Sequence, residues 1–326
     1  MKNKSKNIYL SLILIFLLIS ISINPTSNIT AFYNGIKIWA TIVVPALFPF
    51  FLFTKLLCEL NISQTICKYL NPITKNLYNC EGVAGYIFFS SIISGYPVGA
   101  KLVNEFYSKN LISNDQAYRI VTFTSTSGPL FIIGTIGIGM FSNKNLGIVI
   151  LLSHLISALI NGLIYRKYKL KNNSKIKIQN INQTSPNILN ECMINSIKSI
   201  LLIGGYISIF FLITNIISTY NLFYPITSLL SKIVKINNLD EILSAIFNGL
   251  IEVTQGCLNI SNLNLSPQLS CIICTGLVSF GGFSIHMQAY SFLKSSNIKY
   301  SFFLLQKTTH TIISIIIACV ASHLIL

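Results

Sequence analysis

Charged side chains are scarce in this chain. Asp, Glu, Lys and Arg make up 10% of its 326 residues, whereas hydrophobic residues make up 52%. A soluble domain of this length needs a charged exterior that such a composition cannot supply. Acidic residues are especially few, because only 8 of them accompany 23 Lys and Arg. The composition therefore excludes an ordinary soluble protein and predicts an all-α, polytopic membrane protein whose main partner is the lipid bilayer.

The basic residues lie in short loops rather than on one face. They gather in Lys2, Lys4 and Lys6 and in the segment 166–177. Basic loops beside apolar spans indicate the cytoplasmic side of a membrane protein. No basic face carries the interleaved aromatic residues that nucleic-acid binding uses, so we expect no nucleic-acid partner.

Signatures of enzyme chemistry are missing as well. The sequence contains no nucleophile elbow, no phosphate-binding loop and no metal-ligand spacing. Cys271 and Cys274 share a helical face, but no histidine or third cysteine follows closely enough in sequence to complete a zinc set. We therefore expect no enzyme activity, no bound metal and no cofactor, and we interpret the cysteines as small packing residues.

Long apolar runs are abundant instead. A helix needs about 20 apolar residues to cross about 30 Å of hydrocarbon. The first run follows basic residues, as in a signal peptide, but no small-residue cleavage site comes after it, so we interpret it as a retained span. The predicted full spans are 8–23, 36–57, 146–165, 194–217 and 302–324.

Two other regions contain only short apolar runs, interrupted by Gly, Pro and polar residues. They match each other when the chain is shifted by 154 positions, which aligns Gly95 with Gly249 and Gly128 with Gly282. The aligned glycines fall where the hydropathy breaks. This pattern is typical of transporters built from repeats with discontinuous helices. The matching stretches are 90-SSIISG-95 with 244-SAIFNG-249, and 127-SGPLF-131 with 281-GGFSI-285.

The breaks and the basic loops together predict two inverted halves joined by a basic cytoplasmic linker, with about seven full spans and two re-entrant hairpins. A competing layout makes residues 83–99 a true span, but it sends the basic linker to the opposite side. In the favoured layout the first half is 1–165, with a hairpin near 83–119 and a broken span at 120–140; the linker is 166–190; the second half is 191–326, with a hairpin near 239–264 and a broken span at 267–290.

The four breaks are the predicted binding site. Irregular backbone at membrane depth is costly unless protein or a water-filled cavity satisfies it. Glycine permits the tight turns, and the N–H groups freed at helix ends can face an anion. Alternatively, such residues only permit close packing or kinks. The predicted substrate-binding residues at the breaks are Gly95, Tyr96, Pro97, Gly99, Ser127, Gly128, Asn248, Gly249, Gly281 and Gly282.

Polar side chains near the breaks complete this prediction. Lys101 can neutralise a substrate carboxylate or snorkel to the membrane interface. Glu252 lies in the second hairpin tip, where an acid is costly and can serve a cation, a proton or a partner lysine. His286 can couple transport to protons or act as a hydrogen-bonded packing residue. Gln255 and Gln288 can bond a polar ligand.

Three further signals are interpreted as structural only. His154 and His310 lie within predicted full spans and belong to no motif. The segment 113-SNDQ-116 predicts a capping box at the start of a helix, with Ser113 as the N-cap and Gln116 reaching back.

Four motifs in this order resemble the YlbJ-type sporulation integral membrane proteins: SGYPVGAKLV, SGPLFIIGTIGIGMF, NGLIEVTQGC and SFGGFSIHMQ. The resemblance extends from about residue 30 to the C-terminus. This family is part of the nucleoside-recognition, or Gate, domain group, which is similar to concentrative nucleoside transporters with inverted repeats and re-entrant hairpins. The resemblance implies an integral permease of the cell membrane, placed in the outer forespore membrane during sporulation, that moves dipicolinic acid, a small anionic solute.

The leading hypothesis is therefore a permease that works by alternating access and is coupled to a proton or a sodium ion. A non-transporting scaffold or signalling protein of spore assembly is the alternative from another class, and a nucleoside or cation transporter is the third. Paired breaks favour transport, because a scaffold has no need for unwound helices at mid-membrane.

Overall fold

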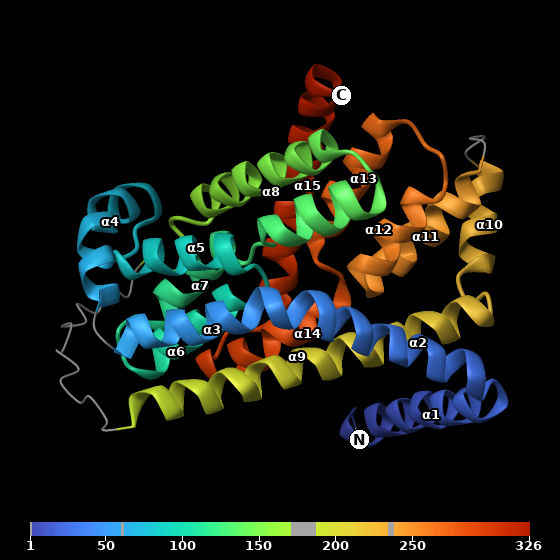
Figure 1. Ribbon diagram of the computed structural model, residues 1–326, viewed down its shortest axis with the longest axis horizontal. Coiled ribbons are helices and arrows are strands. Elements are labelled where there is room, and N and C mark those ends of the chain that lie inside the picture. The colour runs from blue at the N-terminus through green and yellow to red at the C-terminus, as the bar shows by residue number, and fades with distance from the viewer. Residues whose placement is uncertain (1, 60–61, 171–186, 234–237) are drawn as a thin grey trace.

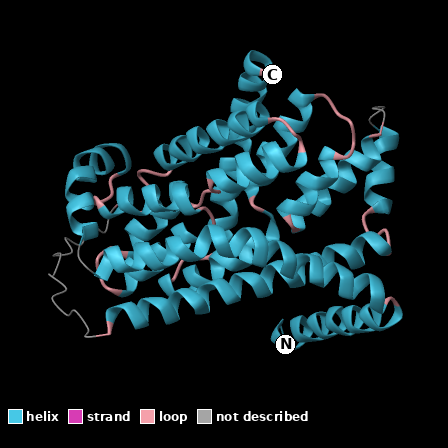
Figure 2. Ribbon diagram, viewed as in Figure 1, coloured by secondary structure: helices cyan, strands magenta, loops and turns pink. Residues whose placement is uncertain are grey.

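The computed structural model describes residues 2–59, 62–170, 187–233 and 238–326, which form helices and their connecting loops (Figures 1 and 2). Residues 171–186 of the predicted basic linker lie outside the described residues. In the first half of the chain the helices are α1 (Lys2–Ile23), α2 (Pro25–Ile38), the π-helix η1 (Trp39–Val43), α3 (Val44–Glu59), α4 (Ile62–Tyr78), α5 (Val83–Ser94), α6 (Val98–Ser108), α7 (Asn114–Thr124), the π-helix η2 (Leu130–Met140) and α8 (Lys144–Ile164). In the second half they are α9 (Ile188–Thr219), α10 (Tyr224–Ile233), α11 (Leu239–Ile251), α12 (Val253–Ser261), α13 (Pro267–Phe280), α14 (Gly282–Leu293), the 3₁₀-helix η3 (Lys294–Ser296) and α15 (Tyr300–Ile325).

Among the described residues, four helical segments are long and apolar enough to cross a membrane, namely α8, α9, α15 and Pro267–Ser296. The predicted spans at 146–165, 194–217 and 302–324 coincide with three of these candidate spans. A fifth arises if Ser11–Ile23 and Pro25–Val43, which meet at an angle of 107°, form one bent span. The all-helical membrane fold is thus observed, whereas the predicted total of seven spans is not confirmed.

The helices are interrupted at four places in the two regions where the hydropathy breaks. The interruptions separate α5 from α6, α7 from η2, α11 from α12, and α13 from α14. Helix α5 has 12 residues and rises only about 18 Å, so it is too short to cross about 30 Å of hydrocarbon. This length argues against the competing layout in which 83–99 is a full span. The α13–α14 interruption does not prevent Pro267–Ser296 from counting as one candidate span.

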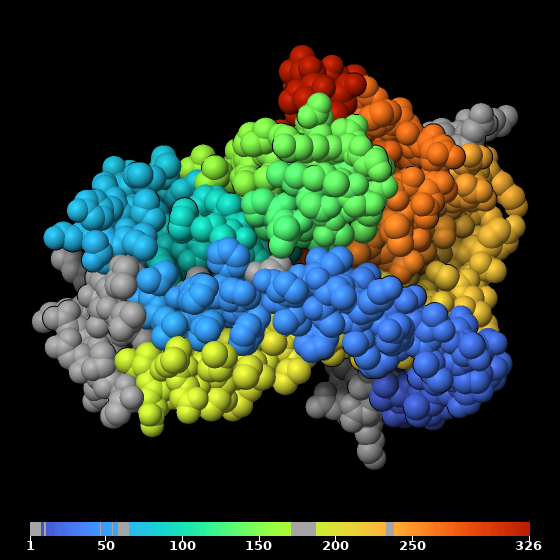
Figure 3. Space-filling model, in the orientation of Figure 1, coloured from blue at the N-terminus to red at the C-terminus, as the bar shows by residue number. Residues whose placement is uncertain are grey.

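Helices α2 and α3 run beside α9 along the longest axis of the molecule (Figure 1), and Figure 3 shows these segments side by side across the lower part of one face. Behind them, α8 packs against α15, and α15 also packs against α13. This arrangement places all four interruptions near the middle of the helix bundle.

The predicted capping box starts α7. The Gln116 amide N–H donates to Ser113 Oγ at 3.2 Å, and the Ser113 amide N–H donates to Gln116 Oε1 at 3.1 Å.

Candidate functional site

The first break packs directly on the second. Gly95 ends α5 with φ of +79°, in the left-handed region that favours glycine. A Cβ atom on Gly95 would lie 2.6 Å from the amide nitrogen of Gly128, and one on Gly128 would lie 3.2 Å from the amide nitrogen of Gly95. The two backbones therefore approach more closely than any side chain allows, which explains why both positions are glycine.

The third and fourth breaks also pack on each other. A Cβ atom on Gly282, whose φ is +64°, would lie 3.0 Å from the carbonyl oxygen of Gly249. Glu252 joins α11 to α12 in an extended conformation. Its carboxylate caps α12, because it accepts the Gln255 amide N–H at 2.8 Å and the Thr254 hydroxyl at 3.1 Å. Glu252 is thus a helix cap as well as a buried acid.

His154 of α8 connects one pair of breaks to the other. Its Nε2 accepts the backbone N–H of Ser127 at 2.9 Å, and its Nδ1 lies 2.9 Å from Ser279 Oγ. Because Nε2 is the acceptor, a neutral ring carries its proton on Nδ1 and donates it to Ser279. His310 of α15 donates from Nε2 to the carbonyl oxygen of His154 at 3.0 Å when that nitrogen carries its proton. The histidines interpreted as structural therefore hold the breaks in register.

Lys307 of α15 places a buried amino group at the first two breaks. Its side chain is fully buried, and its ammonium group donates to the Tyr96 hydroxyl at 2.5 Å and to the Ser125 carbonyl at 3.3 Å. Among the described residues no carboxylate forms an ion pair with it. Tyr96 in turn donates its hydroxyl proton to the Val278 carbonyl at 3.4 Å. A buried, unneutralised lysine is costly, which marks it as a candidate functional residue.

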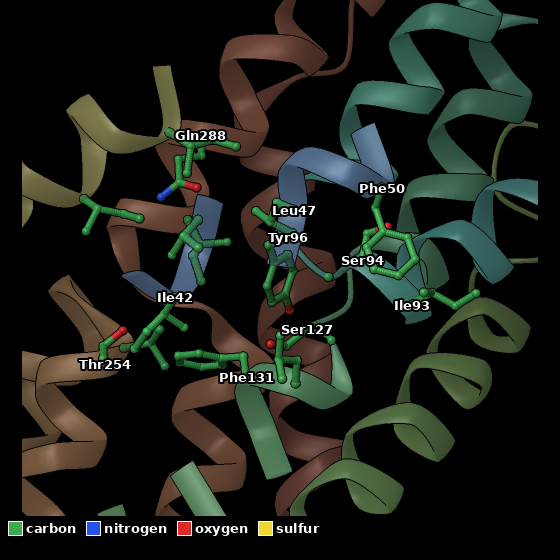
Figure 4. Close-up of a pocket in the computed structure, with 18 of the residues that line it drawn as sticks. Ile42, Leu47, Phe50, Ile93, Ser94, Tyr96, Ser127, Phe131, Thr254 and Gln288 are labelled. Atoms are coloured by element: carbon green, nitrogen blue, oxygen red, sulfur yellow. The ribbon is translucent and has the colours of Figure 1, made fainter. Parts of the chain in front are cut away.

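A cavity of about 120 Å³ lies where these elements meet, and we term it the central cavity (Figure 4). Its wall includes apolar side chains from η1, α3 and α9. Figure 4 shows the Tyr96 ring directed toward Ser127. The hydroxyl groups of Ser94 and Ser125 are buried and have no hydrogen-bond partner in the described part of the chain. Of these two, Ser94 lines the cavity, so the wall offers a hydrogen-bonding group to a ligand.

The structure brings six of the predicted site residues into the cavity wall: Gly95, Tyr96, Ser127, Gly128, Glu252 and Gln288. The other nine, which do not line it, are Pro97, Gly99, Lys101, Asn248, Gly249, Gln255, Gly281, Gly282 and His286. Pro97 is the N-cap of α6, and Gly281 caps α13 with φ of +92°. Gly249 is in close contact with Gly256, because a Cβ atom on Gly256 would lie 2.2 Å from the Cα atom of Gly249.

Three more of the residues outside the wall have identifiable contacts. Gly99 lets α6 meet the end of α7, because a Cβ there would lie 1.8 Å from the Thr124 carbonyl oxygen. The Lys101 ammonium lies 4.2 Å from the centroid of the Phe51 ring. His286 is buried, with Nε2 2.9 Å from the Phe280 carbonyl oxygen. These contacts are those of packing residues, which is the alternative left open for His286. Asn248 and Gln255 line other cavities.

The residues that sequence reasoning missed are Lys307 and the bridging role of His154. Both lie inside long apolar runs, where they were absorbed into predicted spans. A usable signal was present, because an ionisable residue within a membrane helix is a functional candidate by default. Around His154, the buried polar residues Ser153, Ser157 and Asn161 also share one side of α8.

Comparison with known proteins identifies one informative similarity. No family model matches the chain, and no solved structure matches it. The chain is similar to the "Sporulation integral membrane protein YlbJ" of Bacillus subtilis (strain 168), with 26% identity, over 94% of this chain and 80% of that protein. The similarity supports a YlbJ-type assignment, as the four motifs predict. It does not show the predicted membership of the wider nucleoside-recognition group.

Proposed function

We propose, from the premise that the chain is a YlbJ-type sporulation membrane protein, that it is a permease for a small carboxylate solute. Dipicolinic acid is the solute that we favour, and the outer forespore membrane is the location that we favour. The observation that carries the proposal is the central cavity, which lies where two pairs of helix breaks meet beside a buried lysine. Irregular backbone at this depth is tolerated where it lines a cavity, as in transporters.

The chemistry of the cavity favours an anion with hydrogen-bond acceptors. When its amino group is protonated, Lys307 places a positive charge beside the hydroxyl of Tyr96, a residue of the cavity wall. A carboxylate that takes the Tyr96 hydroxyl proton in place of the Val278 carbonyl, whose bond to that hydroxyl is long at 3.4 Å, would gain from this charge at low local dielectric. It would also offset part of the cost of burying the lysine. The hydroxyl group of Ser94 is available as a further donor.

Transport by alternating access requires the central cavity to open to one side of the membrane and then to the other, so the helices around the breaks must move relative to one another. The order of elements supports an inverted repeat as the basis of this motion. In each half a short helix pair, α5–α6 or α11–α12, precedes a broken pair, α7–η2 or α13–α14, and then a long helix, α8 or α15.

We propose in addition that Glu252 holds the coupling ion, a proton or a sodium ion. Its carboxylate is 3% exposed and lines the central cavity. The donors that it accepts from belong to α12, so a change in its charge would act directly on the position of that helix. Coupling at this residue would join ion binding to movement of the third break.

Uptake into liposomes tests the proposed function. The purified chain is reconstituted and supplied with labelled dipicolinate under an imposed proton or sodium gradient, with protein-free liposomes as the control. We expect saturable uptake that depends on one of the two gradients. Uptake of labelled uridine or of sodium alone would instead assign a nucleoside or cation transporter. The absence of uptake of all three solutes, by protein that remains folded, would favour a non-transporting scaffold of spore assembly.

A further inference from the structure

Helix α2 presents three different faces. One face is buried against α9, where Asn28 accepts the Asn215 side-chain N–H at 3.0 Å and a Cβ on Gly35 would lie 2.7 Å from the Cα of Ser208. A second face is exposed and apolar and includes Ile29, Tyr33 and Ile36. The third is exposed and polar, and its residues recur at alternate spacings of three and four positions, which places them on one side of the helix. This polar face consists of Ser27, Thr30, Asn34 and Lys37 of α2 and continues to Thr41 of η1.

The polar face of α2 lines an open cavity of about 650 Å³, which we term the outer cavity. The opposite walls come from α9, through Asn215 and Ser218, and from α12, through Gln255 and Leu258. The hydroxyl groups of Thr30 and Thr41 donate to carbonyl oxygens of their own helical stretch. The side chains of Asn34 and Lys37 require protein or water beside them, because lipid cannot satisfy their hydrogen bonds. The composition of these walls therefore indicates a water-filled cavity rather than a lipid-facing groove.

The outer cavity leads toward the helix breaks. A further cavity of about 360 Å³ shares Gln255 and Phe211 with it, and shares Thr254 with the central cavity. Ile42 lines all three. Along α9 the lining residues run in order, from Ser218 and Phe211 in the outer cavity to Ile207 and Ile203 in the central cavity. The cavities thus form a series from the C-terminal end of α9 to the middle of the bundle.

Lys37 provides the only ionisable side chain in the described wall of the outer cavity, where the other polar residues are Ser, Thr, Asn and Gln. Its side chain is exposed, and none of the ion pairs of the described residues involves it. A separate acidic cavity, with Asp240 and Glu241, meets the outer cavity at Ser218. The positive charge therefore lies farther along the route toward the breaks than these two acids do.

We infer that the outer cavity is an anion-collecting vestibule, in which Lys37 draws carboxylate-bearing solutes toward the central cavity past Ile42 and Thr254. The inference rests on the proposed function for its substrate class, since it supplies the route to the site at the breaks. A single charge in a narrow, low-dielectric cavity raises the local concentration of an oppositely charged solute. Lys37 therefore acts on the approach of the solute, whereas Lys307 lies at its binding site.

Thiol labelling tests the vestibule without measuring transport. Single cysteines are introduced by Asn34→Cys or Thr41→Cys on the polar face, and by Ile36→Cys or Ala40→Cys as neighbouring controls on other exposed positions of the same helix stretch. Membrane-impermeant methanethiosulfonates, one anionic and one cationic, modify the protein in liposomes, and mass spectrometry of the α2 peptide gives the rates. We expect the polar-face thiols to react with both reagents and the control thiols to remain unmodified.

The charge of Lys37 is then tested by Lys37→Gln in the Asn34→Cys background. We expect the ratio of the anionic to the cationic labelling rate to fall about fivefold to tenfold. Lys144→Gln on α8, which removes the same charge far along the chain and outside the cavity wall, should leave the ratio unchanged. Equal labelling of both faces of α2, or a ratio insensitive to Lys37→Gln, would overturn the inference.

Uptake measurements keep this inference separate from the proposed function. If the liposomes accumulate a carboxylate, Lys37→Gln should raise its KM several-fold at an unchanged maximal rate, because the lysine acts before binding. If they accumulate none while the labelling ratio still depends on Lys37, the permease proposal fails and the anion-selective vestibule stands.

Discussion

Replacing Lys307 by methionine separates the stability of the fold from the recognition of the solute. The ammonium group lies 2.5 Å from the Tyr96 hydroxyl. A carboxylate bonded to that hydroxyl would therefore lie within about 5 Å of the charge. At an effective dielectric of about 20, this distance corresponds to about 3 kcal/mol of attraction, or about 200-fold in affinity. The solute also loses hydration on entry, so we expect Lys307→Met to weaken carboxylate uptake about 10-fold to 100-fold.

The effect on folding should have the opposite direction. Lys307 is fully buried without a carboxylate partner in the described part of the chain. Methionine has a similar volume and removes the desolvation cost of the ammonium, although it also removes two hydrogen bonds. We expect the midpoint of thermal unfolding in detergent to stay the same or rise. Lys144→Met at an exposed position of α8 is the matched control for both assays.

The result that would refute this reasoning is retained uptake. If Lys307→Met transports a carboxylate with unchanged KM, the lysine does not contribute to recognition and serves only the local structure. Loss of uptake accompanied by a lower unfolding midpoint would also contradict the predicted separation, because the lysine would then be required for the fold. Tyr96→Phe tests the same site independently. We expect it to weaken carboxylate uptake about fivefold to tenfold, because the hydrogen bond to the solute is missing.

The remaining predictions concern the contacts between the breaks. Gly95→Ala should lower the free energy of unfolding by about 2–4 kcal/mol, because the new methyl group meets the Gly128 backbone at a positive φ; Gly205→Ala, with open space around its Cβ, should be nearly neutral in the same denaturation assay. His154→Ala should lower the free energy of unfolding by about 2–4 kcal/mol, because it leaves the Ser127 amide and the Ser279 hydroxyl unpaired. The control His323→Ala, on the exposed end of α15, should lower it by less than about 0.5 kcal/mol. Glu252→Gln should preserve folding, because the amide oxygen can still accept the Gln255 N–H, but uptake should lose its dependence on the ion gradient; an unchanged dependence would remove Glu252 as the ion site.

The sequence predicts the helix interruptions well because their chemistry is local. Gly95 and Gly282 have positive φ values that glycine adopts readily. The long helices α8, α9 and α15 were likewise predictable, since length and hydropathy are sufficient to recognise a span. These features depend on short stretches of chain and not on the partners that the stretches meet.

The cavity wall was less predictable because it depends on contacts between distant residues. Lys101 lies close to the first break in sequence, yet its ammonium packs over Phe51. The cation at that break comes from Lys307, which is 211 positions away from Tyr96. The polar face of α2 escaped notice for another reason, since most of it precedes the predicted span at 36–57. Its spacing is readable only when residues 25–43 are known to be helical.

The contact between α2 and α9 limits how the protein can open. Gly35 allows the two helices to touch, and the Trp39 indole N–H donates to the Ile200 carbonyl at 2.9 Å. Separating the helices would break this bond and expose the close glycine contact, so we expect α2, η1 and α9 to move together. The walls that face this unit come from α12 and η2. If a solute passes from Lys37 to the breaks, as we propose, we expect α12 and η2 to move aside for it while the unit of α2, η1 and α9 stays in place.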